Sequence, residues 1–185
     1  MFKSTEGGHL SQKTDNRVVK RGILLGIGLT LVIFPVCFNL IPQIDHEPGL
    51  LARLKLGIEC AVFPGIFFLI LIIRIGMQRY GNTAEDPTEL LASSHAMEVD
   101  LRVLTNTHEQ LLVFAINLSA LSILLPFSYL TLLPIYSGTF ILGRLLFWAG
   151  YRHQVLWRAP GFGLNMFPAA LGLIYSAIAI FTAMD

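Results

Sequence analysis

Charged residues are scarce in this chain: they make up 14% of its 185 residues, while 54% are hydrophobic. A soluble domain usually carries about 25% charged residues. A water-facing surface has to be built from such residues, so an ordinary soluble domain is excluded. The composition favours an integral membrane protein with little material left over for a soluble part.

Strong net charge, paired cysteines and metal-ligand spacing are also lacking. The net charge is +1, so nothing indicates attraction to nucleic acid. Cys37 and Cys60 both lie in apolar runs, where cysteine packs as a small hydrophobic residue, and no disulfide framework is implied. The histidines show no spacing such as HExxH, and GxSxG, P-loop and GxGxxG motifs are absent. We therefore expect neither a metal site nor a nucleotide site.

Long apolar runs dominate what is present. A membrane-spanning helix needs about 20 mostly apolar residues. The first run is too long for the core of a signal peptide, which has about 7–15 residues. We therefore predict an all-α membrane protein with a polar tail (1–21), an extra N-terminal span (22–42) and a four-helix membrane domain (54–183). The five predicted spans are 22–42, 56–77, 111–133, 135–155 and 164–183.

Lysine and arginine counts predict the orientation, because these residues concentrate on the cytoplasmic side. Of 13 such residues, ten fall on the side of the N-terminal tail, two on the other side and one, Arg144, inside the membrane. The N-terminus is therefore predicted to be cytoplasmic. The loop 78–104 would be cytoplasmic too, with a helix that starts near Asp86-Pro87 and continues into the third span.

Polar residues at membrane depth are costly and are candidate functional residues. Counting from the cytoplasmic ends predicts two polar levels. The upper level pairs Arg144 with Asn117, with Glu59 as a further candidate partner. The lower level gathers Glu109, Tyr151 and Arg152, together with Arg74 and Arg79. The two stripes at helical spacing that carry these levels are Arg102, Asn106, Glu109, Val113 and Asn117 on the third span, and Arg144, Phe147, Tyr151 and Val155 on the fourth.

Each level has a structural and a functional interpretation. The contact of Arg144 either specifies which helix faces which or has a direct role in function. The arginines of the lower level either anchor helix ends at the interface or surround one carboxylate as an anion-binding site.

Two segments resemble the MAPEG superfamily, the membrane-associated proteins of eicosanoid and glutathione metabolism. The pattern is Asn106-x-x-Glu109 near the start of one span, then Arg144 seven residues before Tyr151 on the next. The resemblance covers roughly 54–181. The segment 161–168 and the extra first span are similar to the mattrin-like branch of this superfamily.

The resemblance implies a four-helix bundle that assembles as a homotrimer, with glutathione between subunits at the cytoplasmic end in the enzymatic members. By position, Asn106 and Glu109 would contact glutathione, with Arg74, Arg79, Arg102 and Tyr151 as further binding candidates. The catalytic candidates are Tyr151 and an arginine after it, either Arg152 or Arg158. Thr105 departs from the pattern, because an arginine often precedes the asparagine.

Three functions compete. The first is a non-enzymatic protein of endoplasmic reticulum, Golgi or endosomal membranes that acts through protein contacts of its tail and the loop 78–104. The second is a glutathione transferase or peroxidase that acts on lipophilic acceptors at the cytoplasmic face. The third is a small transporter, which usually needs broken helices or internal repeats; neither is evident in the sequence.

Overall fold

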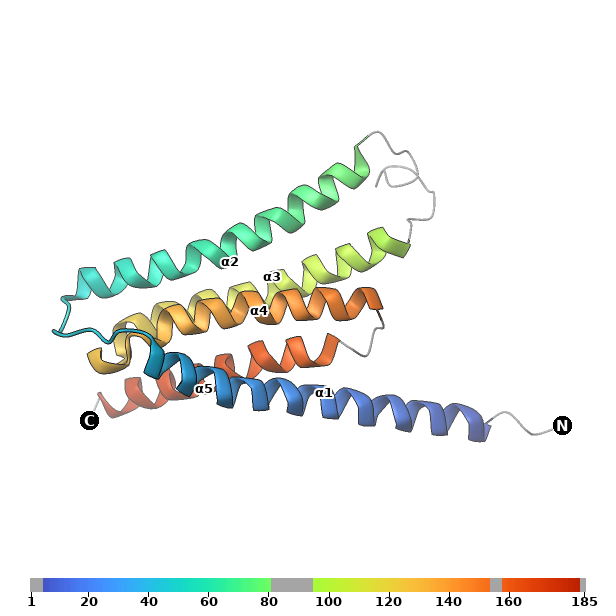
Figure 1. Ribbon diagram of the computed structural model, residues 1–185, viewed down its shortest axis with the longest axis horizontal. Helices are drawn as coiled ribbons and strands as arrows, with labels where there is room; N and C mark the ends of the chain where they lie inside the picture. Colours follow the sequence, from blue (N-terminus) through green and yellow to red (C-terminus); the bar gives the residue numbers. More distant parts are fainter. Residues whose placement is uncertain (1–4, 81–94, 154–157, 184–185) are drawn as a thin grey trace.

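The computed structural model describes residues 5–80, 95–153 and 158–183 of the chain. Within these ranges the fold is all-α, as predicted, and consecutive long helices run antiparallel (Figure 1). The elements are α1 (Thr5–Leu40), α2 (Leu50–Arg79), α3 (His95–Leu124), the short 3-10 helix η2 (Phe127–Tyr129), α4 (Leu132–His153) and α5 (Ala159–Thr182).

Five helices are long and apolar enough to cross a membrane, which confirms the number of predicted spans. Their apolar segments are Asn16–Leu40, Leu50–Arg79, Ala96–Leu124, Phe127–His153 and Ala159–Thr182. The chain is therefore an integral, multi-pass membrane protein. Large apolar side chains are exposed on the helix surfaces, which suits a lipid environment; on α2 they include Ile58, Phe63, Ile66, Ile70 and Ile73.

The third span differs from its predicted bounds. The helix α3 begins by His95 and ends at Leu124, whereas the apolar run predicted 111–133. The turn lies at residues 125–131, with Pro126 before η2. Pro134 instead belongs to the first turn of α4, where proline is tolerated because no intrahelical N–H donor is needed there. The predicted helix start at residues 86–89 and the predicted position of Val155 lie outside the described residues.

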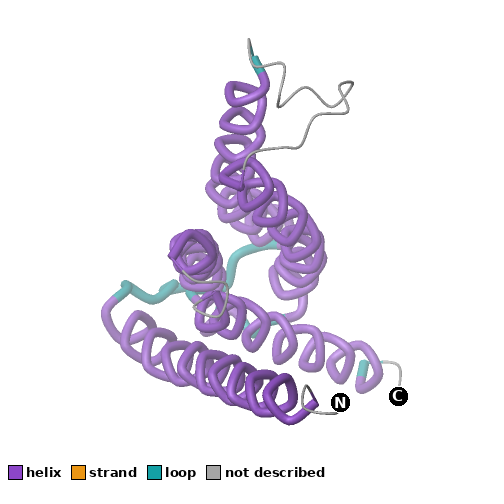
Figure 2. The backbone as a smooth tube through the Cα atoms, turned by 90° about the vertical axis from the view of Figure 1, so that its right-hand side faces the viewer, coloured by secondary structure: helices purple, strands orange, loops and turns teal. Residues whose placement is uncertain are grey.

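The helix α4 is the centre of the bundle, because it contacts all four of the other long helices. Figure 2 shows the bundle end-on, with α2 and α3 forming one side. Two apolar clusters fill the interior. One surrounds Phe114 and Phe140, and the other contains Phe67, Val103 and Tyr151.

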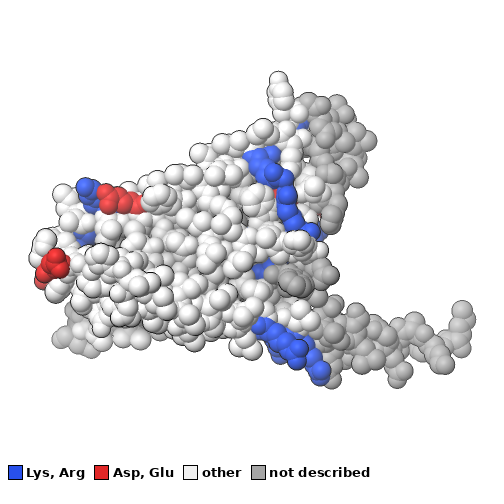
Figure 3. Space-filling model, viewed as in Figure 1, with Lys and Arg blue, Asp and Glu red and all other residues white. Residues whose placement is uncertain are grey.

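The two ends of the bundle differ in charge (Figure 3). We call the end where α1, α3 and α5 begin and α2 and α4 end the basic end. Its described cations are Arg17, Lys20 and Arg21 on α1, Arg74 and Arg79 on α2, Arg102 on α3, Arg152 on α4, and Arg158 just before α5. The opposite end carries Arg53 and Lys55, which are paired with Glu47 and Glu59.

Candidate functional site

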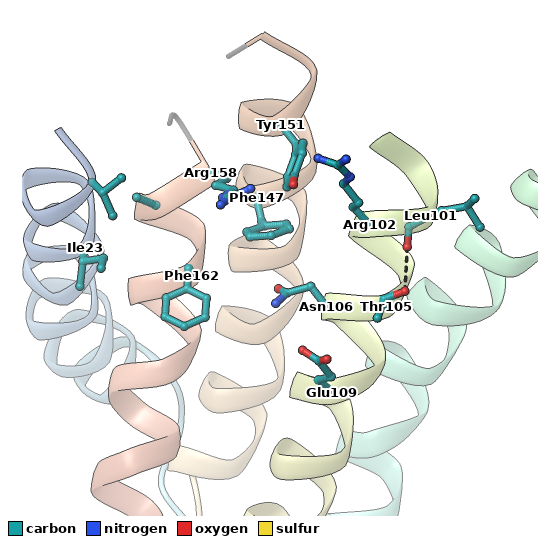
Figure 4. A pocket seen from close by; sticks show the side chains of 12 residues that line it. Ile23, Leu101, Arg102, Thr105, Asn106, Glu109, Phe147, Tyr151, Arg158 and Phe162 are labelled. Atoms are coloured by element: carbon teal, nitrogen blue, oxygen red, sulfur yellow. Dashed lines mark hydrogen bonds between the residues drawn. The ribbon is translucent and has the colours of Figure 1, made fainter. Parts of the chain in front are cut away.

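A groove of about 560 Å³ opens at the basic end between α1, α3, α4 and α5 (Figure 4). We call it the basic-end groove. Four long helices contribute to it, so residues far apart in the sequence meet there. Its lining residues are Val19, Ile23, Leu101, Arg102, Thr105, Asn106, Glu109, Phe147, Tyr151, Arg158, Ala159 and Phe162.

One side of the groove is polar and comes from α3. Arg102, Asn106 and Glu109 share a helix face, because positions i, i+4 and i+7 lie on one stripe. Thr105 also lines the groove, but its hydroxyl donates to the Leu101 carbonyl at 3.0 Å. The Thr105 hydroxyl therefore has its proton in a bond to the helix backbone and does not offer it to a ligand. The α3 side offers one carboxylate, one amide whose oxygen accepts from Arg144, and one guanidinium that pairs with the exposed Glu98 at 3.8 Å.

The facing side carries Tyr151 and Arg158. The guanidinium of Arg158 lies over the Tyr151 ring, 4.7 Å from its centre, and the Tyr151 ring packs against Phe147 at 5.6 Å. A cation over an aromatic face is attracted by the electrons of the ring. Of the two arginines that the sequence left open, Arg158 therefore lies in the groove beside Tyr151.

Arg152 lies elsewhere, in a buried cluster around Asp100. The Asp100 side chain is 1% exposed and accepts hydrogen bonds from Arg74 Nε at 2.9 Å, Arg152 Nη2 at 3.0 Å and Trp148 Nε1 at 2.9 Å. Gln78 Nε2 adds a fourth donor at 2.8 Å. The cluster joins the end of α2, the start of α3 and the end of α4.

The predicted gathering of arginines around Glu109 is therefore wrong. The carboxylate that gathers arginines is Asp100, and Arg74 and Arg152 lie with it rather than in the groove. Arg79 does not line the groove either. Sequence reasoning placed Asp100 on the helix that continues into the third span but did not single it out. The available signal was the spacing of Asp100, Val103 and Thr107 (i, i+3, i+7), which puts them on one helix face, and the structure shows that this face is buried.

Arg144 is fully buried on α4. Its Nη1 donates to Asn106 Oδ1 at 2.9 Å, and its guanidinium lies 4.7 Å from the centre of the Phe147 ring. Within the part of the chain that the structure describes, its Nε and Nη2 have no hydrogen-bond partner. Arg144 thus connects α4 to α3 and contacts Asn106 and Phe147, which both line the groove.

The predicted pairing of Arg144 with Asn117 is wrong. Asn117 Nδ2 instead donates to the Tyr136 hydroxyl and to the Ala169 carbonyl, each at 3.2 Å. Glu59 pairs with Lys55 at 3.7 Å on the surface. The predicted levels took Asn106 and Val155 as the cytoplasmic ends of the two helices. The helix α3 instead begins by residue 95, which puts Asn106 eleven residues inside it. Arg144 lies nine residues inside α4 from its end at His153, so these two are level.

Among the residues that the structure describes, no group of three or more His, Cys, Asp or Glu side chains could hold a metal ion. His108, for example, stacks on Phe68 with ring centres 5.8 Å apart. The polar side chains of the groove carry guanidinium, amide, carboxylate and phenol groups. These groups suit an organic ligand that carries charge.

The fold and the groove define a multi-pass helical membrane protein with a polar site at one end of its bundle. The sequence pattern of the MAPEG family matches residues 58–178, about two thirds of the chain, and the chain belongs to this family. The match covers nearly all of α2 to α5 and leaves α1 outside it. The family resemblance drawn from the Asn106-x-x-Glu109 segment is thereby confirmed.

Two curated relatives support the predicted similarity to the mattrin-like branch, because both are Transmembrane protein 79, which is also called mattrin. Transmembrane protein 79 of Bos taurus is 24% identical over 160 residues, which is 84% of this chain and 40% of that protein. Transmembrane protein 79 of Mus musculus is 24% identical over 134 residues, which is 72% of this chain and 34% of that protein. This chain therefore spans well under half the length of the relatives it matches.

Proposed function

We propose that this chain binds glutathione, or a small peptide of the same charge pattern, in the basic-end groove. The arrangement of Arg102, Glu109 and Arg158 around one cavity is the observation that carries this proposal. Glutathione has two carboxylates, one ammonium group and one thiol: Arg102 can bind a carboxylate and Glu109 the ammonium group, which leaves Arg158 beside Tyr151 for the sulfur. Arginine is suited to carboxylates because its planar donors bind both oxygens at once.

The proposed orientation places the groove at the cytoplasmic face. Ten of the 13 lysines and arginines fall in segments assigned to the N-terminal side, and lysine and arginine concentrate on the cytoplasmic side of membrane proteins. A homotrimer, as the family resemblance implies, is compatible with a groove that opens at one end of the bundle. We also propose that this protein resides in endoplasmic reticulum, Golgi or endosomal membranes.

Tyr151 and Arg158 are the residues that would act on a bound thiol. Glutathione supplies a nucleophilic sulfur, and a thiol reacts as its thiolate. A nearby guanidinium and a phenol hydroxyl both favour the charged form, the first by attraction and the second by donating a hydrogen bond. This would make the chain a glutathione transferase or peroxidase that acts on lipophilic acceptors.

A second candidate is a protein without catalysis that acts through protein contacts of the tail and the loop 78–104. The observation that favours it is the shortage of free donors near Tyr151. Arg74 and Arg152 are bound to Asp100, and the Thr105 hydroxyl donates to the backbone. Thiolate stabilisation would then depend on Arg158.

Glutathione binding to the purified protein, followed by thermal shift and by calorimetry, tests the proposal. We expect millimolar glutathione to stabilise the wild type and Glu59→Gln, whose carboxylate lies at the opposite end, but not Glu109→Gln. No stabilisation of the wild type would refute the binding site. Binding without conjugation of a lipophilic electrophile would favour the protein without catalysis, whereas conjugation lost in Tyr151→Phe and Arg158→Gln would favour the transferase.

A further inference from the structure

The helix α1 is part of the groove although it lies outside the segment that matches the family. Its residues Val19 and Ile23 line the cavity. The helix packs along α5 and also contacts α4, and Figure 1 shows α1 and α5 side by side over much of their length. One wall of the groove therefore comes from the additional span of the same chain.

The contact between α1 and α5 is close enough to fix this wall. A Cβ atom on Gly26 would collide with the Pro160 carbonyl oxygen, and one on Gly163 would collide with the backbone of Ile23. Thr30 donates to the Gly26 carbonyl at 3.1 Å and lies 3.4 Å from the Leu164 carbonyl. Because backbone meets backbone, α1 has little room to shift along α5.

The wall that α1 builds differs chemically from the wall opposite. Val19 and Ile23 are aliphatic, and Phe162 of α5 lies beside them. Asn106 and Glu109 project from α3 on the other side, as Figure 4 shows. A ligand whose charged groups bind the α3 side therefore turns its remaining surface toward α1 and Phe162.

We infer that α1 forms the apolar wall of this groove within a single chain, and that the wall selects a glutathione-class ligand carrying an apolar substituent on its sulfur. The inference rests on the proposed binding of glutathione. Covering Val19, Ile23 and Phe162 with an alkyl chain removes apolar surface from water, which strengthens binding. Unsubstituted glutathione leaves that wall uncovered.

The position of α1 is tested by a cysteine pair, with no ligand involved. In a Cys37→Ala/Cys60→Ala background, Gly22→Cys and Ala159→Cys place two thiols side by side, because a Cβ on Gly22 would lie 2.7 Å from the Ala159 Cβ. Mild oxidation should form a disulfide within one chain, since a small shift gives the usual Cβ separation of about 3.5–4.5 Å. The control pair Gly28→Cys/Ala159→Cys should stay reduced, because nothing lies near a Cβ on Gly28.

Non-reducing gels and thiol alkylation distinguish the outcomes. A monomeric band with both thiols protected supports an α1 wall built in the same chain. A covalent dimer would mean that α1 packs against a neighbouring chain, and two free thiols would mean that α1 does not lie on α5. Either of these two results overturns the inference.

Selectivity is tested with glutathione and S-hexylglutathione on the full chain by calorimetry. We expect the wild type to bind S-hexylglutathione about tenfold or more tightly than glutathione. Ile23→Trp should fill the apolar side of the groove and reduce the ratio of the S-hexylglutathione affinity to the glutathione affinity toward one. Leu24→Trp is the matched control, because Leu24 is 64% exposed on the outer side of α1 and should behave as the wild type.

Ile23→Ala keeps the test valid if the tryptophan variant fails to fold, because a smaller side chain should also weaken S-hexylglutathione binding selectively. If the wild type binds neither ligand, the proposed function fails. If it binds both equally, or if the Ile23 and Leu24 variants behave alike, only the selective role of α1 is overturned.

Discussion

Arg152 Nη2 lies 3.0 Å and 3.1 Å from the two carboxylate oxygens of Asp100, joining the end of α4 to the start of α3. The indole of Trp148 lies under this arginine, with the guanidinium 5.2 Å from the ring centre. Arg74 approaches the same carboxylate from α2. A single buried carboxylate thus fixes the positions of three helix ends, and Arg152, one of its partners, directly follows Tyr151, which lines the groove.

Asp100→Asn should destabilise the fold, because the amide leaves Arg74 and Arg152 without their shared counter-charge. Both arginines are partly exposed and keep some water, so we expect a loss of about 1–3 kcal/mol rather than the larger value for a fully buried pair. Thermal or chemical unfolding in detergent measures it. Glu98→Gln is the control on the same helix, because its ion pair with Arg102 is exposed and 3.8 Å long. An equal effect of both substitutions would contradict a special role for Asp100.

Asn106→Leu should cost about 2–4 kcal/mol, because it removes the acceptor of a fully buried arginine and leaves that charge without a hydrogen bond. The double variant Asn106→Leu/Arg144→Met should regain much of the loss, since the buried charge is then gone as well. A double-mutant cycle on unfolding free energies reports the coupling. Additive effects would show that the Asn106–Arg144 contact contributes nothing.

Gly26→Ala should weaken the packing of α1 on α5, because the added methyl group meets the backbone of Pro160 and Leu164. A backbone atom cannot rotate away, so we expect destabilisation of about 1–3 kcal/mol by overpacking. Gly28→Ala on the same helix meets nothing within 4 Å and should be neutral or stabilising by up to about 1 kcal/mol, because alanine favours helix. Melting temperatures of the two variants give the comparison, and equal temperatures would argue against close packing at Gly26.

Cysteine labelling should reveal the proposed orientation. His46 and His153 are both exposed, one after α1 and the other at the end of α4. In a Cys37→Ala/Cys60→Ala background with the N-terminus cytoplasmic, a membrane-impermeant maleimide should reach His46→Cys from the non-cytoplasmic side. His153→Cys should react only after that membrane is opened. The reverse pattern would invert the topology and place the groove away from the cytoplasm.

Much of the site's location could be predicted from the sequence, but its contacts could not. Arg102, Asn106, Glu109 and Tyr151 line one groove, and their shared level follows from helical spacing and from the direction of each span. The sequence also predicted that Arg74, Arg79 and Arg152 belong to the site. The structure puts them at the same end of the bundle but not in the groove. Their side chains are long, and which carboxylate each one meets depends on the angle between helices rather than on residue spacing.

Hydrophobic length and charge are properties of each segment alone, so the amino-acid sequence was enough to predict five membrane-spanning helices and the cations at one end of the bundle. The packed bundle was needed to show that Asp100 rather than Glu109 binds two arginines, that Arg144 meets Asn106, and that α1 lines the groove. These contacts could not be predicted because they depend on where helices start and how they are offset along one another. That offset is set by packing between segments distant in the chain, such as Gly26 of α1 against Pro160 of α5.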